Sequence, residues 1–292
     1  MLRSLVGSEM CIRDRSTVRR MGIFSHGVDS VQVHRDEPVF DGQFSNQCYQ
    51  DAVEEAFRDF RAKSVTDGRW DPEGGTVLTE DWARIIMHLP YAFQAKRMFP
   101  AVFAYERRGS ASWTDVEAEI GLPPSINDFD DTPEGQAEHA KALDGYRRRI
   151  SKTQAYRDFH AERIEKGQRA SSLIGNQYTG SIFLAMMSTF ESDYEGDSPL
   201  DGQQFGLCGY GSGAKAKVFE GVVSDRWREV VASWNLFERM AGRMAIDQVT
   251  YELLHKGIHD GSVLNPRGEF ALVEIEGGEG ELEGARTYAW VE

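Results

Sequence analysis

The sequence contains little cysteine, and the cysteines it has are scattered. Only Cys11, Cys48 and Cys208 occur in 292 residues. An odd number without close pairs argues against a disulfide framework, and no pair has the spacing of metal ligands. We therefore expect a protein of the reducing cytoplasm with no metal site.

A basic surface and a long apolar run are also missing. Lys and Arg number 33 against 47 Asp and Glu, which gives a formal net charge of −14. Nucleic acids and anionic membranes both need a basic protein face, so this charge argues against either as a partner. The run "IFLAMM" is far shorter than the roughly 20 apolar residues of a membrane-spanning helix. The apolar share of 40% is that of a globular protein.

The first fifteen residues, "MLRSLVGSEMCIRDR", differ from the rest of the chain. They have neither the apolar segment of a signal peptide nor a helical period. Their second half resembles a translated sequencing-library adaptor. We expect residues 1–15 to be a non-native leader and residues 16–292 to carry the fold.

Strand and helix patterns alternate along the remaining chain, and no internal repeat interrupts them. This order, with antiparallel edges, predicts a layered α/β fold with a mixed sheet and helices on its faces. Residues 109–170 are expected to form an insertion, with a polar loop over 109–135 and then a charged, exposed helical layer. The expected strands are 28–39, 82–90, 202–213, 216–223, 269–275 and 285–291, and the expected helices are 46–65 (N-capped by Ser45), 91–108, 177–192, 227–242 and 245–259.

His88 stands where the buried strand "RIIM" ends and a helix is about to begin, with Pro90 fixing the exit. The unpaired N–H groups of a helix start favour developing negative charge nearby. An imidazole there can donate a hydrogen bond to a carbonyl oxygen or transfer a proton. A buried histidine bonded to the backbone is the alternative, and position alone favours it.

Asn176, in "LIGNQYTGSIF", has two possible roles of the same kind. Its amide can cap the helix that follows, or it can donate to a thioester or ketone oxygen. The glycines of "GYGSG" (209–213) permit a close backbone approach to a ligand or, equally well, a tight hairpin.

The cysteines and the basic residues give weaker signals. Cys48 falls on an amphipathic helix and Cys208 on an apolar strand, so packing explains both better than nucleophilic catalysis. Lys96 and Arg97 form a small basic cluster that could bind phosphates. Such residues are more often simply charged side chains on the solvent-exposed face of a helix.

Taken together, four stretches in this order resemble the 3-hydroxy-3-methylglutaryl-CoA synthase family of the thiolase superfamily. They are "FDGQFSNQCYQDA", "IMHLPY", "GNQYTGSIF" and "GYGSGAKAKVFEG". The resemblance covers most of residues 22–292. It implies a thiolase-like fold, of which this chain would be the C-terminal half.

The resemblance also implies roles for individual residues. His88 matches the histidine that binds the acetoacetyl-CoA carbonyl, and Asn176 matches an asparagine beside the reacting carbonyl. Phe93 stands where the family usually carries a lysine that contacts CoA. The implied acyl-CoA site further includes Ser45, Tyr178, Tyr210, Gly211 and Ser212, with Arg97 in place of a second CoA-contacting lysine.

One part of the family pattern has no counterpart. The family forms an acetyl-enzyme on a cysteine, helped by a glutamate, and no stretch of this chain matches either segment. The resemblance implies an acyltransferase that uses acetyl-CoA and acetoacetyl-CoA without any other cofactor, as a cytoplasmic homodimer of the mevalonate pathway. We expect this chain alone to be inactive.

Two other functions fit the same residues. A related enzyme adds the same two-carbon unit to carrier-protein-bound polyketides, and its motifs would look nearly identical. A non-catalytic acyl-CoA-binding or scaffold protein would need no nucleophile at all.

Overall fold

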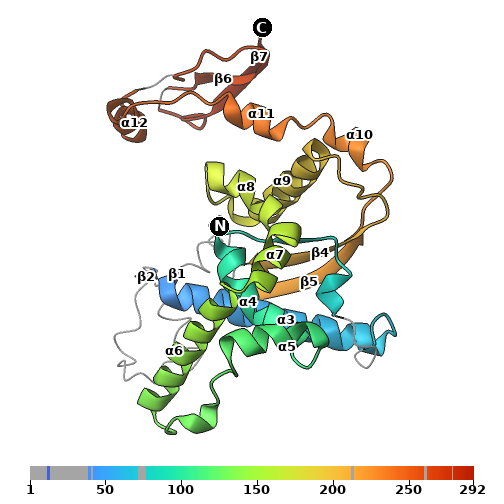
Figure 1. The fold of residues 1–292 in the computed structure, drawn as a ribbon. Coiled ribbons are helices and arrows are strands. Elements are labelled where there is room, and N and C mark those ends of the chain that lie inside the picture. Colours follow the sequence, from blue (N-terminus) through green and yellow to red (C-terminus); the bar gives the residue numbers. More distant parts are fainter. Residues whose placement is uncertain are drawn as a thin grey trace. The chain divides into compact units, whose positions relative to one another are not determined.

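The computed structural model describes residues 12–13, 39–40, 42–71, 77–211, 214–259, 262–277 and 279–292. Two compact units divide the chain, one ending at Phe237 and one running from Glu238 to Glu292. Figure 1 traces both. None of the described helices is long and apolar enough to cross a bilayer.

A three-stranded mixed sheet organises the first unit. Strand β3 (Arg84–Met87) pairs in parallel with β4 (Gln204–Gly211), and β4 pairs antiparallel with β5 (Lys215–Val222). This confirms the predicted buried strand and the predicted strand pair around "GYGSG". A short antiparallel pair, β1 (Ile12–Arg13) with β2 (Val39–Phe40), precedes the sheet in the chain. The rest of the strand expected over 28–39 lies outside the described residues.

Helices cover both faces of the sheet (Figure 1). Helix α9 (Ser181–Glu195) packs on one face, and α3 (Gly42–Thr66) and α4 (Gln94–Arg107) lie on the other. The remaining helices of this unit are α5 (Ala111–Ile120), α6 (Pro133–Ile150), α7 (Gln154–Arg163), α8 (Glu165–Ile174), α10 (Trp227–Val231) and the start of α11 (Leu236–Ala241), with 3-10 turns η3 (Leu78–Glu80), η4 (Ile126–Asp128) and η5 (Tyr178–Gly180).

The second unit contains the rest of α11, helix α12 (Gln248–His255) and an antiparallel hairpin. Strands β6 (Glu269–Ile275) and β7 (Arg286–Val291) form the hairpin, which confirms the predicted pair. Asp247 caps α12 by accepting a hydrogen bond from the Thr250 N–H at 2.7 Å.

Three expectations about the helices were wrong. Helix α3 begins at Gly42, so Ser45 lies inside its first turn and is not its N-cap. The segment 109–135 is not a plain loop, because it contains α5, whose Trp113 and Val116 are buried three positions apart on one helical face. The helix expected over 177–192 begins only at Ser181, and Tyr178 belongs to the 3-10 turn η5 ahead of it.

The charged helices over 135–167 are also more than an exposed layer. Each has one apolar face that belongs to the main core, although most of its residues are charged or polar. The buried members of these faces are Tyr146, Ile150, Tyr156, Phe159 and Ile164. The predicted helices are therefore confirmed, but the prediction that they form an exposed layer is wrong.

Gly206 on β4 makes room for the largest buried side chain of the core. A Cβ added there would lie 2.0 Å from the Trp82 ring, which is fully buried. The Trp82 Nε1 in turn donates to Glu220 on β5 at 2.7 Å. A glycine is therefore needed at this point of the sheet for steric reasons alone.

We expect Gly206→Ala to lower the free energy of unfolding by about 1–3 kcal/mol, because the tryptophan must leave its place. Urea unfolding followed by tryptophan fluorescence measures the change. Gly145→Ala is the matched control, since a Cβ at this helical position in α6 meets nothing within 4 Å. Equal stability of the two variants would contradict the steric role of Gly206.

A buried carboxylate joins β3 to α8 and α9. Asp193 accepts hydrogen bonds from Arg84 Nε at 2.8 Å and Nη2 at 2.6 Å, and it also contacts Lys166 Nζ. The Asp193 side chain is wholly buried and the Arg84 side chain is 12% exposed. The pair therefore holds the strand against the helix with a two-pronged, charge-assisted contact.

Asp193→Asn should lower the unfolding free energy by about 3–5 kcal/mol, because two cations would lose their buried partner. Chemical unfolding monitored by circular dichroism gives the value. The exposed pair Arg226–Glu229 provides the comparison. Glu229→Gln should change stability by only about 0–1 kcal/mol. A loss of similar size in both variants would mean that burial adds nothing to the Asp193 contact.

Candidate functional site

His88 directly follows β3 and is buried, with 3% of its surface exposed. Its N–H donates to the Cys208 carbonyl on β4 at 2.9 Å, and its carbonyl accepts from the Tyr49 hydroxyl at 2.9 Å. Burial lowers the pKa of the imidazole to about 4. The ring is therefore neutral near pH 7, with one nitrogen that can donate a hydrogen bond and one that can accept.

The alternation of side chains along β3 indicates where the His88 imidazole lies. Arg84 reaches Asp193 on α9, and Ile86 lines a pocket with side chains of α9. Successive residues of a strand point to opposite faces, so His88 falls on this same face of the sheet. Since Met87 pairs with Cys208, His88 comes level with Gly209.

The first turn of α9 lies at the same end of the sheet. A Cβ on Gly209 would be 3.9 Å from Cδ1 of Ile182, the second residue of α9. The strand end that carries His88 and the helix start that follows Asn176 therefore meet around Gly209. No direct hydrogen bond joins the two side chains among the described residues.

The Asn176 side chain bonds within the turn ahead of α9. Its Oδ1 accepts from the Tyr178 N–H at 2.7 Å and from the Ser181 hydroxyl at 3.2 Å. The Ser181 hydroxyl in turn accepts from the Gln177 N–H at 3.1 Å. Gln177 and Gly180 are the N-cap residues of η5 and α9, so Asn176 caps neither, and its contacts in the turn use only the amide oxygen. The amino group on Nδ2 of the same exposed side chain is left to donate to a ligand.

Tyr178 lies beside Asn176 with an unusual backbone. Its φ is 49°, in the left-handed region that side chains other than glycine avoid, and its ring is 54% exposed. Such a conformation costs about 1–2 kcal/mol, and residues held this way cluster at functional sites. The strain supports the expectation that this segment does more than begin a helix.

Tyr210, another predicted site residue, has its ring close to that of His88. Its ring is buried, its centroid is 6.3 Å from the His88 ring, and it packs edge-on against Tyr49 at 4.6 Å. Gly211 ends β4 with open space where a Cβ would be. Ser212 lies outside the described residues.

The remaining predicted residues lie on the helices of the other face. Ser45 is half-buried in the first turn of α3. Arg97 is exposed on the first turn of α4 and donates to the Tyr91 hydroxyl at 3.2 Å. Phe93 precedes α4 and is 61% exposed, so no cation occupies this position.

Sequence reasoning missed Tyr49, which was placed only on the apolar face of its helix. The phenol contacts His88 across 39 positions of sequence. A tyrosine on a stripe otherwise made of Val53, Phe57 and Phe60 is the one signal that could have found it, because a buried hydroxyl needs a hydrogen-bond partner.

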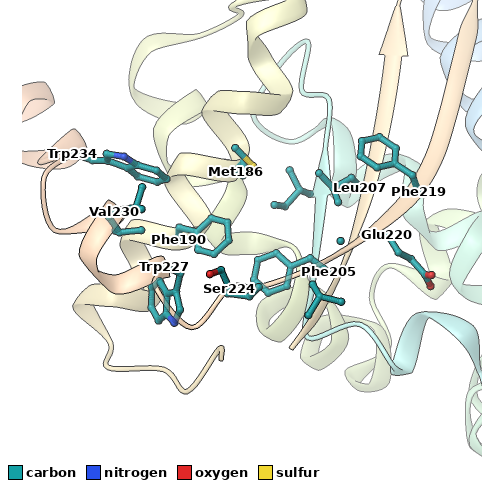
Figure 2. A pocket seen from close by; sticks show the side chains of 15 residues that line it. Met186, Phe190, Phe205, Leu207, Phe219, Glu220, Ser224, Trp227, Val230 and Trp234 are labelled. Carbon is teal, nitrogen blue, oxygen red and sulfur yellow. The ribbon is translucent and has the colours of Figure 1, made fainter. Parts of the chain in front are cut away.

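An apolar groove of about 450 Å³ lies between the sheet and α9. Figure 2 shows Met186 and Phe190 of α9 facing Phe205 and Leu207 of β4 across it. The carboxylate at its rim, Glu220, is already bonded to Trp82 and Arg69. The groove thus offers apolar contact rather than polar groups for a thioester.

Known proteins share this arrangement. The family profile described as "Hydroxymethylglutaryl-coenzyme A synthase C terminal" matches residues 32–257. The chain belongs to the hydroxymethylglutaryl-CoA synthase family. This confirms the resemblance carried by the four sequence motifs.

Individual members of the hydroxymethylglutaryl-CoA synthase family agree with the profile. The hydroxymethylglutaryl-CoA synthase of Haloferax volcanii is 28% identical over 270 residues, which cover 90% of this chain and 56% of that protein. A solved structure of MvaS in complex with 3-hydroxy-3-methylglutaryl coenzyme A has a TM-score of 0.60 at 27% identity, over 89% of this chain and 53% of that one.

A third comparison concerns the fold alone. The HMG synthase of the curacin biosynthetic pathway, solved with holo donor-ACP, has a TM-score of 0.55 at 17% identity, over 88% of this chain and 52% of that one. The fold is therefore the thiolase-like fold of HMG synthases, as expected. The chain spans about half the length of the relatives it matches.

The lowered pKa values of two buried histidines predict how stability depends on pH. Burial lowers the pKa of both His88 and His160 to about 4. In the unfolded chain each would bind a proton near its ordinary pKa of about 6.5. Below that pH the unfolded state binds more protons than the folded state, so stability is lost as the pH falls from about 6.5 to about 4.

The free energy of unfolding should fall between pH 6.5 and pH 4.5 in the wild type. In His160→Gln this fall should be smaller by up to about 3 kcal/mol. Urea unfolding at both pH values measures the difference, and all other titrating groups cancel in the comparison. His255→Gln is the control, because this side chain is exposed on α12. An unchanged pH dependence in His160→Gln would contradict the burial effect.

Proposed function

We propose that this chain is the acceptor-binding part of an acyl-CoA condensing enzyme. The reaction would make 3-hydroxy-3-methylglutaryl-CoA from acetyl-CoA and acetoacetyl-CoA, in the mevalonate pathway of the cytoplasm. The observation that carries the proposal is the buried, neutral His88 at the strand end that meets the start of α9, with Asn176 in the turn ahead of that helix. Family membership supports it.

In the proposed reaction the methyl carbon of an acetyl-enzyme, once deprotonated, attacks the ketone carbon of acetoacetyl-CoA. A carbon–carbon bond forms, the electron pair of the C=O bond moves to the ketone oxygen, and this oxygen then takes up the proton that was removed from the methyl group. The neutral His88 donates a hydrogen bond to this developing oxyanion, and the Asn176 amino group supplies a second donor. Water then hydrolyses the enzyme thioester and releases the product.

The cysteine and glutamate of that cycle match no segment of this chain, so another part of the enzyme would supply them. The apolar groove beside α9 fits such a part. Its lining is almost wholly apolar, including Val222 and Val230, which are 72% and 52% exposed. A surface of this kind marks a protein contact. We propose that the half of the synthase beyond this chain covers it, and that the whole enzyme is a homodimer.

Phe93 favours a second candidate, a synthase that acts on carrier-protein-bound polyketides. A carrier presents phosphopantetheine and lacks the nucleotide phosphates of CoA, so fewer cations are needed. Phe93 replaces a CoA-contacting lysine of the family, which leaves Arg97 as the matching cation on this turn of α4. The greater similarity to the Haloferax synthase than to the curacin synthase supports the CoA-dependent candidate.

Binding of acetoacetyl-CoA tests the proposal without the missing nucleophile. Two donors aimed at the ketone oxygen should raise the fraction of bound ligand in its enolate form, which absorbs ultraviolet light. His88→Ala and Asn176→Ala should each lower the enolate-to-ketone ratio about 100-fold, since one oxyanion donor contributes on the order of 3 kcal/mol. His255→Ala should leave the ratio unchanged. Wild-type enolate levels in the His88 and Asn176 variants would refute the assigned roles.

The same titration separates the two substrates. Arg97→Ala should weaken acetoacetyl-CoA but not acetoacetyl-pantetheine if the nucleotide phosphates are bound. Equal affinity of the wild type for both ligands would favour the carrier-bound substrate.

A further inference from the structure

Tyr49 places a phenol hydroxyl inside the core, on the largely apolar buried face of α3. The residue is 2% exposed, and Val53 and Phe57 continue the same face of α3. A phenylalanine would fill the same volume, so packing alone does not account for the hydroxyl. Its hydrogen bond does: the Tyr49 hydroxyl donates to the His88 carbonyl at 2.9 Å.

The His88 carbonyl needs a donor from outside its own segment. Strand β3 has ended at Met87, Pro90 carries no N–H, and α4 does not begin until Gln94. A buried carbonyl without a partner is unfavourable, and nearly all such groups in proteins are bonded. Tyr49 supplies this donor from a different element, α3.

His88 is consequently held through both of its backbone polar groups. Its N–H is bonded to Cys208 on β4 and its carbonyl to Tyr49 on α3. The Tyr49 ring also packs edge-on against Tyr210, whose ring centroid is 6.3 Å from that of His88. The peptide that carries the imidazole is thus fixed from two sides, and one face of the residue is closed by aromatic rings.

We propose that Tyr49 is a positioning residue, whose hydroxyl fixes the His88 peptide so that the imidazole presents its N–H to the ketone oxygen of the substrate. The inference rests on the proposed function, in which His88 contacts that oxygen. Tyr49 itself does not touch the substrate. Small displacements of a catalytic group reduce its effect strongly, so the hydroxyl acts through geometry.

Tyr49→Phe removes the hydroxyl and keeps the ring. The His88 imidazole signals in two-dimensional NMR, assigned with His88→Gln, should shift and broaden in Tyr49→Phe. Their titration midpoint should move up from about 4 as water reaches the loosened peptide. The titratable groups that act on the neighbouring Tyr49 are Cys208, Tyr210 and Tyr91, and thiols and phenols ordinarily titrate well above this range.

Tyr146→Phe is the matched control. It removes a hydroxyl that also donates to a backbone carbonyl, that of Gly121, from an equally buried ring on α6. It should lower stability without altering the His88 signals. Unaltered His88 signals and titration in Tyr49→Phe, with a stability loss like that of Tyr146→Phe, would overturn the proposal.

Acetoacetyl-CoA binding provides the functional readout. In Tyr49→Phe the enolate-to-ketone ratio of the bound ligand should fall about tenfold while the dissociation constant stays within about twofold, because donor geometry changes and the ligand contacts do not. An unchanged ratio would refute the positioning role. If the wild type binds no acetoacetyl-CoA, the proposed function fails, and the NMR comparison still decides whether Tyr49 holds His88.

A measurement on the wild type tests the proposal even if the Tyr49→Phe variant does not fold. The Tyr49 hydroxyl proton should exchange slowly with water and show a nuclear Overhauser effect to the Leu89 N–H, which belongs to the same peptide as the His88 carbonyl. Fast exchange of that proton would mean that the hydrogen bond is not maintained, and the proposal would fall.

Discussion

The contact between Arg84 and Asp193 is the constraint on which the geometry of the site depends. Burial alone would raise the pKa of the Asp193 carboxyl, but hydrogen bonds from Arg84, Lys166 and Ser198 outweigh this and hold its pKa below the usual value. The carboxylate therefore stays charged and paired. It fixes the start of β3 against the last turn of α9. His88 follows the other end of β3, and Asn176 precedes the other end of α9. Neither element can slide without breaking a buried ion pair.

Much of the fold could be predicted from local pattern. The strand before His88, the helix after it and the strand pair at "GYGSG" follow from apolar runs, Pro90 and glycines. Exposure could not be predicted for the charged helices, because the three or four buried residues in each are outnumbered by charged and polar ones. Helix α5 was missed for a similar reason: the Pro, Gly and Asp around it dominate the composition, and only Trp113 and Val116 mark its buried face.

The candidate site also has some residues that the sequence predicts and others that it does not. Residues in compact motifs, such as His88 and Asn176, could be singled out because their neighbours form a helix start or a strand end. That the Asn176 amide oxygen is used within the turn became visible only with the contacts of Ser181 and Tyr178. Tyr49 could not be linked to His88 at all, since helix periodicity says which face is buried but not what that face meets.

The neutral state of His88 explains why positioning matters so much here. A buried imidazole with a pKa of about 4 carries no charge near pH 7, so it can stabilise an oxyanion only through a hydrogen bond. A cation would attract a nearby anion from several directions, whereas a hydrogen bond weakens steeply when its angle departs from linear. For the proposed function, the donor must therefore be aimed before the substrate arrives. The paired backbone contacts of His88 and the Arg84–Asp193 contact hold it there, and burial, which removes the charge, also excludes the water that would compete for the same N–H.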